Sequence, residues 1–247
     1  MSQTVRAALR TAVAVPTFFL FTWAMAAAII FMSFIDKDSP AIDSIIRFWS
    51  RLFLTTAPLS LEVHGSEHID PSRQYVFVAN HLSNFDIPVM FRTIPVPIRY
   101  LAKKEIYKIP LVAQAMNRIG IVKTDRQAGG AAHALINEGV AAAKARGHSL
   151  IIFPEGTRSK DGKLGGFKKG AFRIAIANQL PVIPITVQGT WEVWPPDAKM
   201  FFPGHAVTIV HDVIETEGMD LTQITELRDR CHAAVASVLP AEAIREP

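Results

Sequence analysis

The stretch YVFVANHLSNFD, at residues 75–86, decides the fold class of this chain. Its first five residues are apolar and rich in β-branched and aromatic side chains, which is typical of a buried strand. The seven residues that follow include a histidine and an aspartate, so polar chemistry begins where the strand ends. In parallel α/β sheets, functional sites gather at the carboxyl ends of strands, which is where this loop would lie.

The same strand pattern recurs along the chain from about residue 60. Six further short apolar runs are found at residues 61–64, 98–102, 120–123, 150–153, 182–187 and 206–210. The run at 182–187 contains Pro184, which indicates a buried strand with the proline near its start or at a sheet edge, and it could also line an apolar groove.

Helical stretches separate several of these runs. Residues 128–146 are rich in alanine and stop at Gly147, a residue suited to the position after a helix. Residues 168–178 form another such stretch, and Asp220 with Gln223 resembles a capping box that opens a final helix through about residue 238. We therefore predict an α/β fold with a mostly parallel central sheet flanked by helices, preceded by an N-terminal membrane-associated helical segment.

The N-terminal segment differs from the rest of the chain. Residues 11–35 form a run of 25 residues without a charge, and a helix needs about 20 apolar residues to cross a bilayer. A cleaved signal peptide and a buried core helix are the alternatives. Ser39 and Pro40 predict the start of a second helix, whose charges at Asp43, Arg47 and Arg51 favour an interfacial or domain-packed helix. We predict membrane-anchoring helices over residues 1–58 and a second domain over residues 59–247.

Composition narrows the class of partner. The 247 residues are 49% hydrophobic and carry a net charge of +4, with an isoelectric point of about 9.3. A basic surface suits anionic partners such as phospholipid headgroups or phosphorylated substrates. A nucleic-acid-binding protein is the weakest interpretation, because the basic residues are spread out and lack interleaved aromatic residues. The single cysteine, Cys231, provides no disulfide framework and no cysteine metal cluster.

The loop at residues 80–86 carries the first candidate site. His81 can take a proton from a hydroxyl near neutral pH, and a carboxylate at the other ring nitrogen would orient the imidazole. Five residues of chain could let Asp86 fold back onto His81. The alternatives are that Asp86 caps a helix starting at Ile87 and that His81 is an ordinary loop histidine.

Three further segments carry charge at strand ends. In FPEGTRS, at residues 153–159, Gly156 permits an unusual turn and Arg158 offers a planar fork for phosphate, while Glu155 could pair with Arg158 or position another donor. An ordinary turn with a Glu–Arg ion pair is the alternative. In GIVKTDR, at residues 120–126, Arg126 and its neighbouring lysine could contact phosphate or be merely solvated. Lys103, at the end of another strand, has the same two interpretations.

Several catalytic motifs are missing from the sequence. There is no Gly-x-Ser-x-Gly elbow, no phosphate-binding Walker loop, no dinucleotide-binding glycine turn and no His-Glu-x-x-His metal motif. With no obvious nucleophile, direct attack by a bound alcohol is simpler than a covalent acyl-enzyme, and we expect no metal and no cofactor.

Taken in order, four blocks resemble those of the 1-acylglycerol-3-phosphate acyltransferase family. They read NHLSNFD at 80–86, GIVKTDR at 120–126, FPEGTRS at 153–159 and VIPITV at 182–187. The second block departs from the family pattern, with Lys123 and Thr124 where phenylalanine and isoleucine are common. This departure puts the identity of the acceptor in question.

The resemblance implies acyl transfer from an acyl-carrier-protein or coenzyme A thioester to lysophosphatidic acid, which gives phosphatidic acid in phospholipid biosynthesis. It implies His81 and Asp86 as catalytic residues. The substrate-binding residues that it implies are Lys103, Arg126, Glu155, Gly156, Thr157 and Arg158. It also implies a membrane-bound protein, in a bacterial inner membrane with the catalytic domain facing the cytoplasm.

Other functions stay open at this point. The acceptor could be glycerol 3-phosphate or another lysophospholipid, or a lipid carrying an amine or hydroxyl. Water as the acceptor would make the protein a thioester hydrolase. A non-catalytic lipid-binding membrane protein could use the same scaffold.

Overall fold

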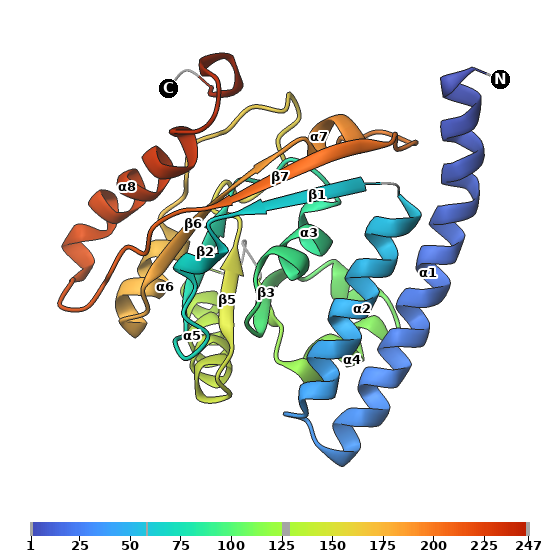
Figure 1. Cartoon of the computed structure of the whole chain (residues 1–247). Helices are drawn as coiled ribbons and strands as arrows, with labels where there is room; N and C mark the ends of the chain where they lie inside the picture. The colour runs from blue at the N-terminus through green and yellow to red at the C-terminus, as the bar shows by residue number, and fades with distance from the viewer. Residues whose placement is uncertain (1, 58, 125–128, 246–247) are drawn as a thin grey trace.

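The computed structural model describes residues 2–57, 59–124 and 129–245, with every side chain except those of residues 3, 103, 123, 124 and 129–135. Its centre is a seven-stranded sheet with the strand order β1-β7-β6-β2-β5-β3-β4 (Figure 1). The strands are β1 (Leu59–His64), β2 (Val76–Ala79), β3 (Ile98–Lys103), β4 (Val122–Thr124), β5 (Ser149–Ile152), β6 (Val182–Gln188) and β7 (Gly204–Val210).

The sheet is mostly parallel, as predicted. Five of its six strand pairs are parallel, and the sixth joins β6 to β7 in antiparallel register. All seven predicted strands are present, with ends that shift by no more than two residues. Pro184 lies near the start of β6 as expected, but β6 is an interior strand and not an edge. A proline has no backbone N–H to donate to a neighbouring strand. Pro184 lies just before the antiparallel ladder with β7, which begins at Ile185.

Helices cover both faces of the sheet (Figure 1). They are α1 (Gln3–Ile35), α2 (Pro40–Thr56), α3 (Asp86–Thr93), α4 (Val112–Ile119), α5 (Gly129–Ala145), α6 (Gly170–Asn178), α7 (Thr190–Val193) and α8 (Ile224–Ala236). Short 3-10 turns lie at η1 (Ser66–His68), η2 (Ile106–Lys108), η3 (Leu221–Gln223) and η4 (Ala241–Ala243).

Strand β2 divides the core into two hydrophobic clusters. Phe77 and Ala79 face a cluster that includes side chains of α1 to α4, whereas Val76 and Val78 face one with side chains of α5, α6 and α8. This alternation follows from the two-residue repeat of a strand. Because both faces are covered, all four residues of β2 are buried.

Local signals in the sequence placed three helix ends, namely the start of α2, the end of α5 and the start of the segment that leads into α8. Ser39 caps α2 with Pro40 as its first residue, and Gly147 adopts a φ of 75° just beyond α5. The capping box of Asp220 and Gln223 is present, although it opens η3 and α8 follows at Ile224. Helix α4 was not predicted. It has only eight residues, its N-cap residue Leu111 provides no side-chain cap and has an unusual φ of 62°, and only Gly120 at its C-terminal end is a cap signal.

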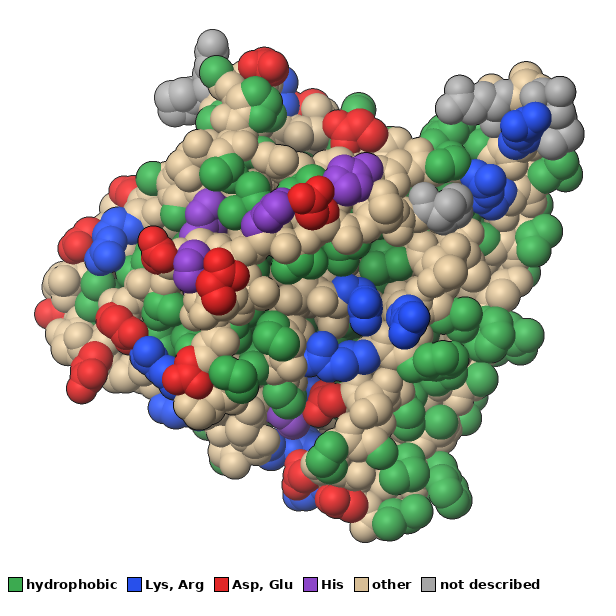
Figure 2. Space-filling model, in the orientation of Figure 1, with side chains coloured by type: hydrophobic (Ala, Val, Ile, Leu, Met, Phe, Trp, Pro, Cys, Tyr) green, Lys and Arg blue, Asp and Glu red, His purple; other side chains and the backbone are tan. Residues whose placement is uncertain are grey.

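Helix α1 starts at Gln3 and spans 33 residues, so it contains the whole charge-free run at residues 11–35 and a preceding stretch with Arg6 and Arg10. Within the part of the chain that the structure describes, it is the one helix long and apolar enough to cross a membrane. Phe31, Phe34 and Ile35 are exposed near its end, and Figure 2 shows hydrophobic side chains gathered there over α1 and α2. Such a surface is consistent with membrane association.

Helix α2 packs on α3 and the residues that follow it through polar as well as apolar contacts. The Arg47 guanidinium donates to the backbone carbonyls of Phe91 and Ile94, at the end of α3, and also to that of Val96. The Ser50 hydroxyl donates to the carbonyl of Pro88 at 2.5 Å. Since the last carbonyls of a helix lack intrahelical partners, Arg47 acts as a cap of α3. The proposed division at residue 58 stays a prediction.

A buried ion pair adds a second tie between α2 and the sheet. Arg99 in β3 donates to the Asp43 carboxylate at 2.7 Å and to the carbonyl of Ile119. Its guanidinium also lies 3.0 Å from Nε2 of His148, and burial together with this positive charge lowers the pKa of His148 to about 4. His148 is therefore neutral near pH 7, which lets Nε2 accept the hydrogen bond.

Candidate active site

The first candidate site forms where β2 ends. His81 is the second residue after β2, and Asp86 is the first residue of α3. The chain turns back between them, so the Asp86 carboxylate lies 2.7 Å from Nδ1 of His81. The predicted approach of the two side chains is present, and Asp86 does not cap α3, because its side chain contacts residues that precede it.

Asp86 is completely buried and accepts four hydrogen bonds. Oδ2 takes the Nδ1 hydrogen of His81 and the backbone N–H groups of Leu82 and Ser83, at 2.6 and 2.7 Å. Oδ1 takes the Thr190 hydroxyl at 2.6 Å. A buried carboxylate needs such donors to remain charged and fixed. The hydrogen bond to Asp86 assigns the ring proton to Nδ1, which leaves Nε2 of His81 as a proton acceptor.

The His81 ring is held on its face as well as at its edge. It stacks on Phe153 with ring centroids 3.9 Å apart and an interplanar angle of 11°. The His81 side chain is 16% exposed, so a substrate can reach the imidazole ring that carries Nε2. A base with a fixed ring and an accessible nitrogen is the arrangement that proton transfer requires.

The turn at residues 153–159 holds the backbone of His81. Glu155 is 7% exposed, and its two carboxylate oxygens accept the N–H groups of His81, at 2.8 Å, and of Gly165, at 3.0 Å. Ser159 donates its N–H to the carbonyl of His81 at 2.7 Å. The expected alternative of a Glu155–Arg158 ion pair is wrong, since Arg158 instead donates to the side-chain oxygen of Asn84. Glu155 thus faces backbone groups and not open space.

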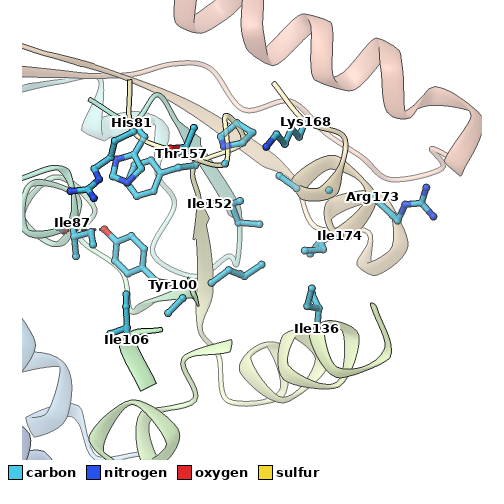
Figure 3. Close-up of a pocket in the computed structure, with 18 of the residues that line it drawn as sticks. His81, Ile87, Tyr100, Ile106, Ile136, Ile152, Thr157, Lys168, Arg173 and Ile174 are labelled. Atoms are coloured by element: carbon cyan, nitrogen blue, oxygen red, sulfur yellow. Dashed lines mark hydrogen bonds between the residues drawn. The ribbon is translucent and has the colours of Figure 1, made fainter. Parts of the chain in front are cut away.

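A cavity of about 450 Å³ opens beside His81 (Figure 3). Its polar lining residues are His81, Asn84, Thr157, Arg158 and Lys168, which we call the rim, together with Asn137 and Arg173. Its floor is apolar, with Ile87, Tyr100, Ile106, Ile136, Ile152 and Ile174. A space that is polar on one side and apolar on the other suits an amphipathic ligand. None of the described lining residues comes from β6, so the idea that residues 182–187 line the groove is wrong.

The predicted substrate-binding residues divide into three groups. Gly156, Thr157 and Arg158 line the cavity, and Glu155 lies behind them. Arg126 and the side chain of Lys103 lie outside the described residues, so their roles stay predictions. Among the described residues, no group of three or more histidine, cysteine, aspartate or glutamate side chains could hold a metal ion.

Two contacts were missed by sequence reasoning. Thr190 reaches Asp86 from 104 positions along the chain, and Lys168 borders the cavity from the segment before α6. Thr190 follows β6 as one of several hydroxyl residues, with no spacing that links it to Asp86. Lys168 stands beside Lys169 in the sequence, and nothing local distinguishes the two.

Burial of Glu155 predicts a pH-dependent stability. Burial raises the pKa of Glu155 from 4.5 to about 7, against the lowering effect of its two backbone donors. The stability contributed by the protonated acid is fully present below pH 4.5 and is lost as the pH rises through about 7. We expect the free energy of unfolding of the wild type to fall relative to Glu155→Gln across this range, by up to about 3 kcal/mol.

Paired melting curves of the two proteins in detergent would test this. The lost hydrogen bond in Glu155→Gln gives an offset that does not vary with pH, and every other titrating group is common to both proteins. A difference in melting temperature that stays constant from pH 4.5 to about 7 would contradict a raised pKa at Glu155.

Known proteins match the region of the chain that contains both loops of the candidate site. A family model described as Acyltransferase matches residues 60–188. Human 1-acyl-sn-glycerol-3-phosphate acyltransferase alpha is 29% identical over 73% of this chain and 64% of its own length. The 1-acyl-sn-glycerol-3-phosphate acyltransferase of Cocos nucifera is 33% identical over 74% of this chain and 58% of its own length. This chain thus spans less than two thirds of these relatives.

A solved structure matches almost the whole chain. The crystal structure of the 1-acyl-sn-glycerophosphate (LPA) acyltransferase PlsC from Thermotoga maritima aligns with a TM-score of 0.77 and 25% identity. The alignment covers 97% of this chain and 100% of that one, so the N-terminal helices are included. The family match spans both the histidine–aspartate loop and the 153–159 turn, and this chain therefore belongs to the acyltransferase family.

Proposed function

We propose that this protein transfers a fatty acyl group from a coenzyme A or acyl-carrier-protein thioester to the free hydroxyl of 1-acylglycerol 3-phosphate. The product would be phosphatidic acid, a step of phospholipid biosynthesis. The observation that carries the proposal is the pairing of His81 with Asp86 beside a cavity with a basic rim and an apolar floor. The relatives named for this reaction support it.

The proposed chemistry starts at Nε2 of His81. This nitrogen takes the proton of the acceptor hydroxyl while the hydroxyl oxygen attacks the thioester carbonyl carbon. Asp86 stabilises the imidazolium that forms. The tetrahedral species then collapses, the C–S bond breaks, and the imidazolium returns the proton to the leaving thiolate. An ester and a free thiol result, and His81 is restored.

The oxyanion of the tetrahedral species needs preorganised donors. In the first loop, the N–H groups of His81, Leu82 and Ser83 are taken by carboxylates. In the second turn, Gly156 donates to the carbonyl of Phe153, whereas the backbone N–H of Thr157 has no hydrogen-bond partner among the described residues. We infer that Thr157 at the cavity rim supplies an oxyanion donor.

The acceptor phosphate would be held by basic residues. Arg158 on the rim is the described candidate, and Lys103 and Arg126 complete the set that the sequence resemblance implies. The apolar floor would take an acyl chain. Helix α1 would keep the site close to lipid. We further propose that the protein resides in a bacterial inner membrane with the site facing the cytoplasm, where thioester donors are available.

The proposal is tested with purified protein in detergent. Lysophosphatidic acid is supplied with acyl-coenzyme A in one arm and acyl-carrier-protein thioester in the other. We expect phosphatidic acid and free thiol to appear in equal amounts, and the faster arm identifies the donor. Thiol release without phosphatidic acid would overturn the assignment of the acceptor and indicate hydrolysis or another acceptor.

A further inference from the structure

The side chain of Lys168 lies against the 153–159 turn, in the space left by the missing side chain of Gly156. A Cβ placed on Gly156 would lie 2.8 Å from Nζ of Lys168 and 3.3 Å from two of its side-chain carbons. Gly156 has a φ of 78°, a conformation that favours glycine. The same glycine therefore serves two purposes, because it makes the turn and leaves room for the ammonium group of Lys168.

The backbone of Lys168 is attached to the same turn. Its N–H donates to the carbonyl of Pro154 at 2.9 Å. Figure 3 shows the Lys168 side chain pointing toward Thr157, whereas Arg173, farther along α6, points away. The backbone of Lys168 is thus bound to Pro154, and its ammonium group lies beside Gly156.

The charge of Lys168 has no partner in the described part of the chain. No carboxylate among the described residues forms an ion pair with it. No aspartate or glutamate appears among the described residues that line the cavity. Arg158 is on the same rim, and Asn84, a neutral residue, holds its guanidinium. Two uncompensated positive charges at one rim favour an anionic ligand group.

We propose that Lys168, acting with Arg158, binds the phosphate of a substrate at the rim of the cavity. The inference rests on the proposed acyl transfer, since it concerns the substrates of that reaction. A phosphate offers several acceptor oxygens, which suit one planar guanidinium and one compact ammonium. The phosphate comes either from lysophosphatidic acid or from the phosphopantetheine arm of the thioester carrier, and the two sources are separable by experiment.

Lys169 is a natural control for Lys168. Both lysines are exposed and adjacent, but Lys169 does not line the cavity. We would compare the wild type with Lys168→Gln, Lys168→Arg and Lys169→Gln in mixed micelles. Each substrate is varied in turn while the other is saturating, so that a separate KM is obtained for lysophosphatidic acid and for the acyl thioester.

Loss of the ammonium group in Lys168→Gln is expected to raise one KM by about tenfold with a much smaller change in kcat. A rise for lysophosphatidic acid assigns the phosphate to the acceptor, and a rise for the thioester assigns it to the donor. Lys168→Arg should recover most of the loss because the charge is retained. Lys169→Gln should match the wild type.

A binding measurement makes the result independent of turnover. Glycerol 3-phosphate and coenzyme A serve as probes, and each is expected to raise the melting temperature of a protein that binds its phosphate. Unchanged KM values in Lys168→Gln, with unchanged probe effects, would overturn the inference while leaving the proposed function intact. Equal losses in Lys169→Gln would also overturn it. A wild type that acylates no lysophosphatidic acid would instead contradict the proposed function, and the probe effects would still decide the role of Lys168.

Discussion

Replacement of His81 by alanine is expected to lower kcat for acyl transfer by about a thousandfold or more, because general-base catalysis contributes on the order of a hundredfold to ten-thousandfold. The expectation rests on the position of His81, with Nδ1 hydrogen-bonded to Asp86 and its other ring nitrogen free to take a proton. Affinity for the substrates should change little, since the other residues of the cavity rim and floor remain. Phosphatidic acid formation under saturating substrates measures the effect.

His64 provides a matched control for this change. It is an exposed histidine on β1, and the residues around the cavity do not include it. His64→Ala should retain wild-type kcat, and both variants should give wild-type circular dichroism. If His81→Ala retained more than about a tenth of the wild-type kcat, His81 could not be the base, given the contribution expected of one.

Replacement of Asp86 by asparagine is expected to lower kcat by about a hundredfold to ten-thousandfold while the fold is kept. An asparagine oxygen in place of Oδ2 can still accept from His81, Leu82 and Ser83. The negative charge that stabilises the imidazolium is lost, however, and an electrostatic term of this kind is worth about three to five kcal/mol in a buried site. Steady-state kinetics measure the loss in kcat.

Asp86→Ala and Thr190→Val separate charge from structure. Asp86→Ala leaves several buried donors without an acceptor, so we expect a lower melting temperature in addition to lost activity. Thr190→Val removes only the donor to Oδ1 and keeps the other three. Its kcat should fall by no more than about tenfold, in line with the loss of a single hydrogen bond to a charged group. Equal kcat in Asp86→Asn and the wild type would contradict the assigned role of Asp86.

The order of the strands explains why these residues meet. Strand β2 lies between β6 and β5, and both neighbours run parallel to it. The carboxyl ends of the three strands therefore share one edge of the sheet. The loop after β5 brings Glu155 to the backbone of His81, and the residues after β6 bring Thr190 to the side chain of Asp86. Each flank of the histidine loop is supported by a different strand.

The sequence by itself determined the layers of the fold and the types of residue at the candidate site. Hydrophobic patterning predicted each of the seven strands. Strands β2, β5 and β6 are buried on both faces and read as apolar runs, whereas β1 and β7 alternate between buried and more exposed residues. Ser39, Gly147 and the Asp220–Gln223 pair marked helix ends, because capping depends on residues close together in the chain. The residue types of His81 and Asp86 and their five-residue spacing made a catalytic pair possible, and the resemblance of the four sequence blocks to the acyltransferase family favoured it over a helix cap and an ordinary loop histidine.

Only the tertiary structure decided which residues hold His81 and Asp86 in place. His81 and Glu155 are 74 positions apart, and Asp86 and Thr190 are 104 positions apart. The strand order brings each pair together, and local sequence patterns do not encode that order. The sequence left open whether Glu155 pairs with Arg158 or positions another donor, because its actual partners, the N–H groups of His81 and Gly165, are not its neighbours in the chain. Lys168 and Lys169 are alike as residues, and they differ because the chain path sets one of them against Gly156. Local interactions fix elements and chemical types, whereas long-range packing fixes which groups face each other.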